Sequence, residues 1–176
     1  MQKLKNEELG RPDLIAYQQV KKLPLILVLD NVRSALNVGS VFRSSDAFRI
    51  EKILLCGITA TPPHKEVAKT ALGATESVNW EYTESTIGAV KKLQMDGVKV
   101  YAMEQVRDSI SLADFQPAPG TIAVVFGHEM DGVAQDVIDI CDGCLEIVQE
   151  GTKHSLNVSV CAGIVCWELH KKLSHL

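Results

Sequence analysis

The sequence predicts an α/β fold with a mainly parallel sheet and helices on both of its faces. From residue 24 onward, short apolar runs alternate with segments of helical periodicity. Helices of about ten residues between strands imply right-handed crossovers, which join parallel strands. The length of 176 residues fits one domain better than two. We therefore expect an N-terminal arm at residues 1–23, rich in Lys, Glu and Gln, and a single domain at residues 24–176.

The first half of the domain begins with residues 24–30 (PLILVLD), a continuous apolar run. Such a run is typical of a strand that is covered on both faces. A helix should follow, with Asn37 as its N-cap and with Val38, Val41 and Phe42 on its buried face. The other elements expected in this half are a strand at 53–56, a helix at 64–71 and a weak strand at 77–82.

The second half contains another continuous apolar run at residues 121–127 (TIAVVFG), which predicts a second strand buried on both faces. The closing helix, expected at residues 155–173, is apolar almost all round over 158–167, so it should lie in the core or at a subunit contact. The apolar surface of this helix exceeds what one small domain easily covers, which predicts a homodimer. The remaining elements are a helix at 86–95, a strand at 98–103, an amphipathic helix at 132–141 and a strand at 144–148.

Composition predicts a soluble cytoplasmic protein. No apolar run approaches the ~18 residues of a membrane helix, and residues 1–5 lack the apolar core of a secretion signal. The cysteines number five, an odd count that favours free thiols in a reducing compartment. The pair Cys141 and Cys144 closes a helix, and no second chelating pair accompanies it, so we interpret it as structural and expect no metal.

Charge is distributed unevenly along the chain. The net charge is -4, yet residues 1–70 carry 11 Lys and Arg against 7 Asp and Glu. A basic surplus of this size is compatible with a phosphate-binding face, but a charge count of this size usually reflects an ordinary solvated surface.

A polar loop follows the first predicted strand. Ligands of open parallel sheets bind beside the carboxyl ends of the strands, where such a loop lies. Residues 30–43 (DNVRSALNVGSVFR) place Asn37 and Gly39 at the start of a helix, whose free amides can meet a phosphate or ribose oxygen. Arg43 lies outside the apolar stripe of this helix. Taken alone, the segment also fits a capped helix with a surface arginine.

Two further polar loops follow later strands. In residues 127–132 (GHEMDG), a zinc-binding HExxH motif would need His where the sequence has Gly132. Residues 151–159 (GTKHSLNVS) are not a P-loop, because Thr152 separates the glycine from the lysine. The chain also lacks GxGxxG, which disfavours a Rossmann nucleotide site. Each loop alone fits a glycine-rich turn or a helix cap about as well as a ligand site.

Together, these loops resemble the three motifs of the SpoU/TrmH family of S-adenosylmethionine-dependent RNA ribose 2′-O-methyltransferases, in the SPOUT superfamily. The matching segments are DNVRSALNVGSVFRSSDAF, VVFGHEMDGV and GTKHSLNVSVCAGIVCWE. The resemblance implies a SPOUT-type fold with a C-terminal trefoil knot, S-adenosylmethionine as cofactor, and a homodimer that completes the site. It also implies a tRNA or rRNA substrate, of which we favour tRNA, and it requires no membrane and no metal.

The resemblance further assigns site residues. Those expected to act on the substrate or in catalysis are Asn37, Arg43, Glu129, Ser155 and Asn157. Those expected to bind the cofactor are Met103, Glu104, Gly127, Ile147 and Leu156. One departure concerns the adenine pocket, because the chain has Val148 and Gln149 where the family usually has Pro and Met.

The reaction so implied needs alignment of the 2′-oxygen with the methyl group and removal of the hydroxyl proton. Arg43 suits the ribose and its phosphate, because a planar cation pairs well with oxygen anions. Arg43 is a demanding choice of base, because a guanidinium does not give up its proton readily. An RNA-binding module without turnover is one alternative, against which the intact motif residues argue. A hydrolase is another, but His154 and Ser155 are adjacent only in sequence, which does not provide triad geometry.

Overall fold

A computed structural model describes residues 1–174 and confirms the predicted α/β class. Its strands are β1 (Leu23–Asp30), β2 (Ile50–Cys56), β3 (Trp80–Thr83), β4 (Lys99–Met103), β5 (Ile110–Ser111), β6 (Ile122–Phe126) and β7 (Gly143–Glu146). They form a seven-stranded sheet in the order β3-β2-β1-β6-β4-β7-β5. Every pair of neighbouring strands is parallel, as the crossover argument predicts. Threading of the C-terminal segment through a knot stays a prediction.

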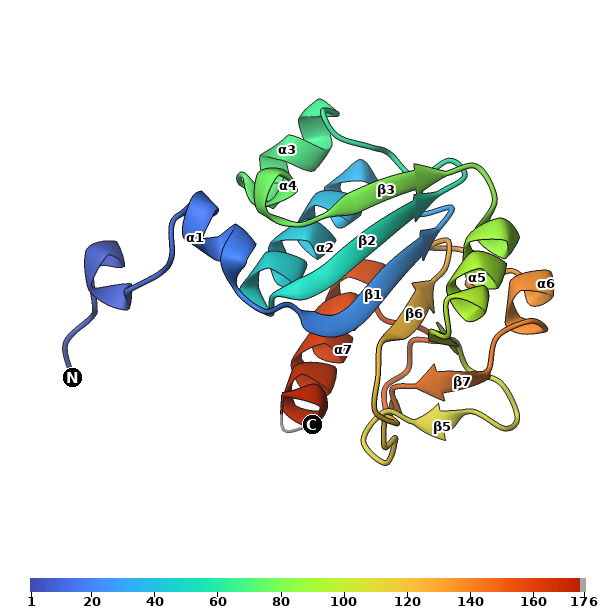
Figure 1. The fold of residues 1–176 in the computed structure, drawn as a ribbon. Coiled ribbons are helices and arrows are strands. Elements are labelled where there is room, and N and C mark those ends of the chain that lie inside the picture. Colours follow the sequence, from blue (N-terminus) through green and yellow to red (C-terminus); the bar gives the residue numbers. More distant parts are fainter. Residues whose placement is uncertain (175–176) are drawn as a thin grey trace.

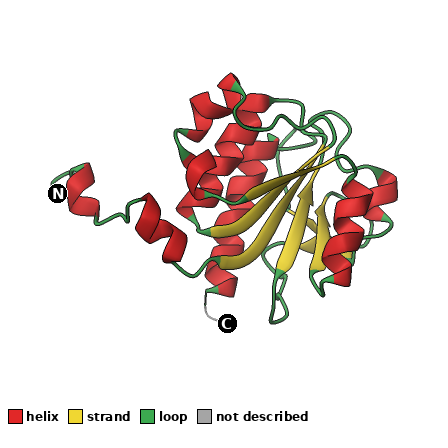
Figure 2. Cartoon of the chain, turned by 45° about the horizontal axis from the view of Figure 1, so that its top comes forward, coloured by secondary structure: helices red, strands yellow, loops and turns green. Residues whose placement is uncertain are grey.

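Helices cover both faces of the sheet (Figure 1, Figure 2). The helices are η1 (Asn6–Leu9, a 3-10 helix), α1 (Leu14–Gln19), α2 (Ala35–Ala47), α3 (Lys65–Ala71), α4 (Ala74–Ser77), α5 (Thr86–Met95), α6 (Gln135–Ile138) and α7 (Val158–Leu173). Side chains alternate along β1, so Leu27 and Leu29 pack in one core with α2, α3 and α7, while Val28 packs in a second core with α5 and α6. The continuous apolar run of β1 is therefore explained by burial on both sides.

Several predicted boundaries are wrong. Asn37 is not the N-cap of its helix, because Ser34 occupies that position and its Oγ accepts a hydrogen bond from the Asn37 amide at 3.4 Å. The helix expected at 132–141 shrinks to α6, the weak strand moves from 77–82 to β3, and the closing helix begins at Val158 rather than at residue 155. Asn157 is the N-cap of α7, and its side-chain oxygen accepts from the amides of Ser159 and Val160. The short strand β5 carries no signal that the sequence analysis used.

Residues that precede β1 form η1 and α1, which extend away from the sheet (Figure 1, Figure 2). Of this segment, Tyr17 is buried, and its hydroxyl donates to the backbone oxygen of Asp46 at 2.8 Å. The Lys22 ammonium lies 3.3 Å from the centroid of the Tyr17 ring. These contacts attach the end of α1 to the C-terminal end of α2.

The order of the strands locates a crevice. The chain adds β2 and β3 on one side of β1, then places all later strands on the other side. The order therefore reverses between β1 and β6, and ligands of open α/β sheets bind beside the carboxyl ends of strands at such a switch point. Within residues 1–174, no helix has the length and apolar character to cross a membrane.

Candidate functional site

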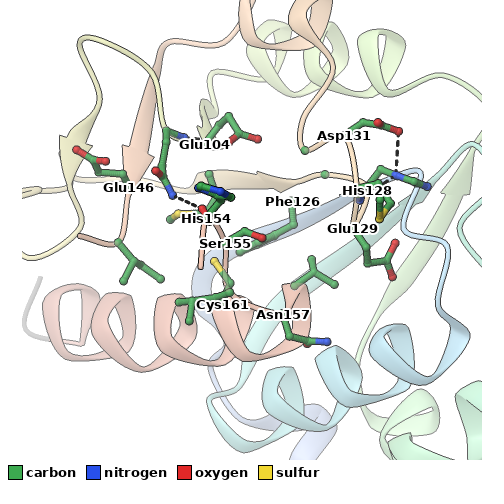
Figure 3. A pocket seen from close by; sticks show the side chains of 18 of the residues that line it. Glu104, Phe126, His128, Glu129, Asp131, Glu146, His154, Ser155, Asn157 and Cys161 are labelled. Carbon is green, nitrogen blue, oxygen red and sulfur yellow. Dashed lines mark hydrogen bonds and ion pairs between the residues drawn. The ribbon is translucent and has the colours of Figure 1, made fainter. Parts of the chain in front are cut away.

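A cavity of about 500 Å³ lies at the carboxyl ends of β4, β6 and β7, closed on one side by the N-terminus of α7 (Figure 3). It contains all five residues predicted to bind a cofactor, namely Met103, Glu104, Gly127, Ile147 and Leu156. Of the five predicted catalytic residues, Glu129, Ser155 and Asn157 also line it. The volume and the mixed polar and apolar lining suit a small organic ligand.

Glu129 connects three separate segments at the rim of this cavity. Its carboxylate accepts hydrogen bonds from the backbone amides of Arg33 and Ser34 and from the side-chain nitrogen of Asn37, each at 2.9 Å. Burial disfavours the charged form of Glu129, but these donors outweigh it and hold the pKa of the carboxyl below its usual range. Glu129 is therefore an anion that fixes the start of α2.

Asn37 extends the same network to α7. Its Oδ1 accepts from the Asn157 side-chain nitrogen at 3.2 Å and from the Ser159 hydroxyl at 3.5 Å. Asn37 does not line the cavity itself, so the structure places it behind Glu129 and Asn157. The network joins side chains that stand 120 residues apart in the chain. Asn157 thus contacts two helices, because its side-chain oxygen caps the N-terminus of α7 and its side-chain nitrogen donates to Asn37 on α2.

A tight turn after β6 forms the floor of the cavity. The backbone groups of His128 and Gly132 exchange two hydrogen bonds, of 3.0 and 2.9 Å. A side chain at Gly127 would collide with the backbone of Gly132, so only glycine fits at the end of β6. Glu104 Oε2 accepts from the Val133 amide at 3.0 Å, which ties the end of β4 to this turn.

Negative charge prevails in the cavity. Its lining includes the carboxylates of Glu104, Glu129, Asp131 and Glu146 (Figure 3). Within residues 1–174, no Lys or Arg lines it. Asp131 lies 3.1 Å from His128 Nδ1. Burial raises the pKa of the Cys161 thiol, which also lines the cavity, to about 12, so this group is a neutral, weakly polar surface. In the part of the chain that the structure describes, no cluster of three His, Cys, Asp or Glu side chains suits a metal ion.

Arg43 lies elsewhere. It lines a separate groove between α2 and α3, together with Lys69, and shares no lining residue with the cavity. A single copy of the chain therefore does not bring Arg43 to the cavity that contains Glu129 and Asn157.

Sequence reasoning missed several lining residues because nothing local marks them. Gln105 donates to the backbone oxygen of His154 at 3.0 Å and so joins two loops across the cavity. Position in the fold is the only signal for most of these residues, since each follows a strand or precedes α7. The missed lining residues include Gln105, Glu146, Gln149, His154 and Cys161. Gln149, at the departure from the family pattern, faces the cavity, whereas Val148 is exposed.

A parallel sheet with a polar cavity at its carboxyl edge defines a class of ligand-binding α/β proteins. Comparison with known families is more specific, because the model of the SpoU rRNA Methylase family matches residues 24–167. The chain belongs to this family, as its three loops predict.

Curated relatives include the 23S rRNA (guanosine-2′-O-)-methyltransferases RlmB of Ralstonia nicotianae and Vibrio vulnificus. The first is 32% identical over 152 residues, which cover 86% of this chain and 60% of the relative. The second is 31% identical over 147 residues, which cover 82% of this chain and 58% of the relative. The chain thus spans about 60% of the length of the first of these relatives.

Solved structures show the same fold. A TrmH/SpoU tRNA modifying enzyme from A. aeolicus aligns with a TM-score of 0.82 at 22% identity, covering 92% of this chain and 81% of that one. A putative RNA methyltransferase of the TrmH family from Porphyromonas gingivalis aligns with a TM-score of 0.74 at 28% identity, covering 84% of this chain and 59% of that one. The SpoU methyltransferase AviRb from Streptomyces viridochromogenes, solved with AdoMet, aligns with a TM-score of 0.79 at 18% identity over 92% of this chain and 65% of that one.

Proposed function

We propose that this chain transfers a methyl group from S-adenosylmethionine to a ribose 2′-hydroxyl of ribosomal RNA. The observation that carries the proposal is the network in which Glu129, Asn37 and Asn157 join three family motifs at the rim of one cavity. Membership of the SpoU family and the names of the curated relatives support the same activity.

The cavity fits S-adenosylmethionine in both shape and charge. Met103, Ile147 and Leu156 offer an apolar surface for an adenine ring, and Gly127 also lines the cavity. Glu104, at the end of β4, is placed to accept hydrogen bonds from a ribose. The carboxylates complement a cationic sulfonium group, since opposite charges attract strongly in a partly enclosed cavity. When bound, the cofactor supplies an activated methyl group, and no metal is required.

The chain's own residues would then position the substrate. Ser155 and Asn157 stand at the mouth of the cavity beside the N-terminus of α7, where hydroxyl and amide groups can hydrogen-bond a ribose. Glu129 and Asn37 hold these groups in place through the network, because each is a hydrogen-bond partner of a neighbouring segment. We assign Glu129 and Asn37 to positioning, and Arg43 to the ribose-phosphate of the reacting nucleotide.

Arg43 reaches a cavity only if a second copy of the chain supplies it, so we propose a homodimer with shared sites. Val160, Ile164 and Trp167 lie on the exposed side of α7 and are 51, 37 and 55% exposed, an apolar face that a partner copy would cover. This face is continuous with the Arg43 groove, because the ring of Phe48, which lines the groove, lies 5.9 Å from that of Trp167. A copy packed on α7 therefore borders the groove.

A mixture of two inactive variants tests the shared site. Arg43→Ala and Asn157→Ala would each disable a homodimer, whereas a mixed dimer contains one site with neither change. Random mixing then restores about one quarter of the normal methyl transfer. If both side chains served one copy, the mixture would stay inactive. A monomer in light scattering at micromolar concentration would also refute this arrangement.

Ribosomal RNA replaces tRNA as the favoured substrate. The sequence analysis favoured tRNA, but the curated relatives carry 23S rRNA in their names. We further propose that residues 1–23 act as an arm that assists RNA binding, that residues 24–176 form the methyltransferase domain, and that the protein acts in the cytoplasm. Lys3, Lys5 and Arg11 give this arm cationic side chains.

Methyl transfer from labelled S-adenosylmethionine to transcribed 23S rRNA, with mass-spectrometric mapping of 2′-O-methylated nucleotides, tests the proposed function. One modified ribose is expected, and a tRNA transcript should remain unlabelled. Calorimetry should detect S-adenosylmethionine binding in the presence of a chelator. Protein that is folded but binds no cofactor, with or without RNA, would refute the assignment.

A further inference from the structure

A second hollow, of about 510 Å³, lies between α2 and α3 and has the opposite charge to the cofactor cavity. Arg43 from α2 and Lys69 from α3 are both exposed there. Among the residues that the structure describes, no carboxylate lines the groove. Asp46, one turn beyond Arg43 on α2, is turned toward Ser77, whose hydroxyl donates to Asp46 Oδ1 at 2.5 Å. Within residues 1–174, neither Arg43 nor Lys69 forms an ion pair or a side-chain hydrogen bond.

The spacing of the two cations is fixed by close packing of their helices. Gly39 of α2 lies so near α3 that a side chain there would collide with the Thr70 hydroxyl and the Val67 carbonyl. The Thr70 hydroxyl also donates to the backbone oxygen of Leu36 at 2.9 Å. Because the helices cannot move apart without breaking these contacts, the backbone positions that carry Arg43 and Lys69 are held beside one groove.

We propose that Lys69 binds a backbone phosphate of the RNA substrate, next to the nucleotide that Arg43 contacts. The proposal rests on the proposed function for the identity of the polyanion. Two cations that form no ion pair, in a groove whose described lining contains no carboxylate, match the phosphodiester chain, and lysine suits a phosphate as a point charge. Ser44 adds a hydroxyl to the groove. Lys69 supplies affinity, and Arg43 on the other helix supplies alignment.

The test compares Lys69→Ala with Lys91→Ala. Lys91 is an exposed lysine on α5, the helix that packs on the opposite face of the sheet, and its removal changes the net charge equally. Binding of a 23S rRNA transcript is measured by filter retention from low to moderate salt. Loss of one phosphate contact should weaken binding on the order of five- to tenfold at 0.1 M salt and reduce the slope of log K against log salt by about 0.7 to 0.9.

Two further readouts separate RNA binding from a structural effect. Lys69→Arg should restore the affinity and the salt slope, because the charge returns. S-adenosylmethionine affinity, and the methyl-transfer rate at saturating RNA, should stay unchanged in Lys69→Ala, so that only the KM for RNA rises.

The proposal is overturned if Lys69→Ala leaves the salt slope unchanged, if Lys91→Ala weakens binding as much, or if the wild-type chain does not bind the transcript. Failure of methyl transfer together with a Lys69-specific loss of RNA binding would contradict the proposed function and leave the phosphate groove in place.

Discussion

Replacing Glu129 by Gln removes a charge without changing the shape of the side chain, and its effect follows from the contacts of the carboxylate. Glu129 Oε2 accepts from the Arg33 amide, while Oε1 accepts from the Ser34 amide and Asn37. An amide side chain retains one oxygen, so its nitrogen faces a backbone donor that loses its partner. With the remaining oxygen kept toward Ser34 and Asn37, the exposed Arg33 amide loses its protein partner and two charge-assisted bonds weaken, which together cost about 2 kcal/mol. For a chain of this length, the loss lowers Tm by roughly 4 to 8 °C at pH 7.

The pH dependence of this difference has a definite sign. The pKa of Glu129 is lowered from 4.5 in the folded chain, so the carboxylate stabilises the fold above pH 4.5 and loses that contribution as pH falls through the lowered value. Thermal unfolding of the wild type and Glu129→Gln should therefore differ by a constant amount between pH 8 and about pH 5, and the difference should shrink below about pH 4.5. Methyl transfer should fall with the stability, because the bond that holds Asn37 loses its charge assistance and weakens.

Glu146→Gln is the matched control, since this carboxylate lines the same cavity and, within the described residues, its side chain accepts no hydrogen bond. It should change the free energy of unfolding by less than about 0.5 kcal/mol. Our account of the network is refuted if Glu146→Gln destabilises as much as Glu129→Gln, or if the difference between wild type and Glu129→Gln already declines between pH 8 and 6.

Three other substitutions have distinct expected outcomes. Arg43→Ala should slow methyl transfer on the order of 10²-fold, which is the scale of one preorganised electrostatic contact. Calorimetry should show an unchanged affinity for S-adenosylmethionine, and near-normal turnover would contradict the assignment of Arg43 to the ribose-phosphate. Ile164→Glu should yield monomers in light scattering, because it places a charge on the apolar face of α7. Met95→Glu, at an exposed position on α5, should leave the dimer intact, and an equal effect of both variants would count against the α7 interface. Lys172 donates to three backbone carbonyls at 2.7 to 2.8 Å, so Lys172→Met should lower the free energy of unfolding in urea by about 2 kcal/mol. Lys171→Met, which removes an exposed ion pair, should have little effect, and similar losses in both variants would refute this account.

The sequence predicted the central strands well, because burial on both faces leaves a continuous apolar run in β1 and in β6. It predicted α5 with its observed bounds, since Thr86 to Met95 shows a helical pattern that local residues decide. The sequence-based prediction failed where a side chain distant in sequence accepts a hydrogen bond from a backbone amide. Glu104 binds the Val133 amide and so competes with a helix start, and α6 begins later than expected.

The cap of α2 illustrates the same limit. Ser34 and Asn37 are both good N-cap residues, so local chemistry does not decide between them. Glu129 determines which residue is the cap, because its carboxylate accepts hydrogen bonds from the Asn37 side chain and the Ser34 amide. These residues lie 92 and 95 positions earlier in the chain. Local preference is thus overridden by a contact that only the folded sheet creates. The resemblance named all of these residues, but it did not say which of them touch.

Helix geometry explains why the predicted site residues separate. Asn37 and Arg43 both lie on α2, six positions apart, which places them about 9 Å apart along the axis and about 120° apart around it. Asn37 therefore points toward Asn157 at the rim of the acidic cavity, whereas Arg43 points into the basic groove. A cation so close to four carboxylates of its own chain would pair with them and be lost to RNA. Holding Arg43 in the basic groove keeps it available to a phosphate, and in the proposed dimer a second copy of the chain would bring that phosphate's ribose to a cofactor cavity.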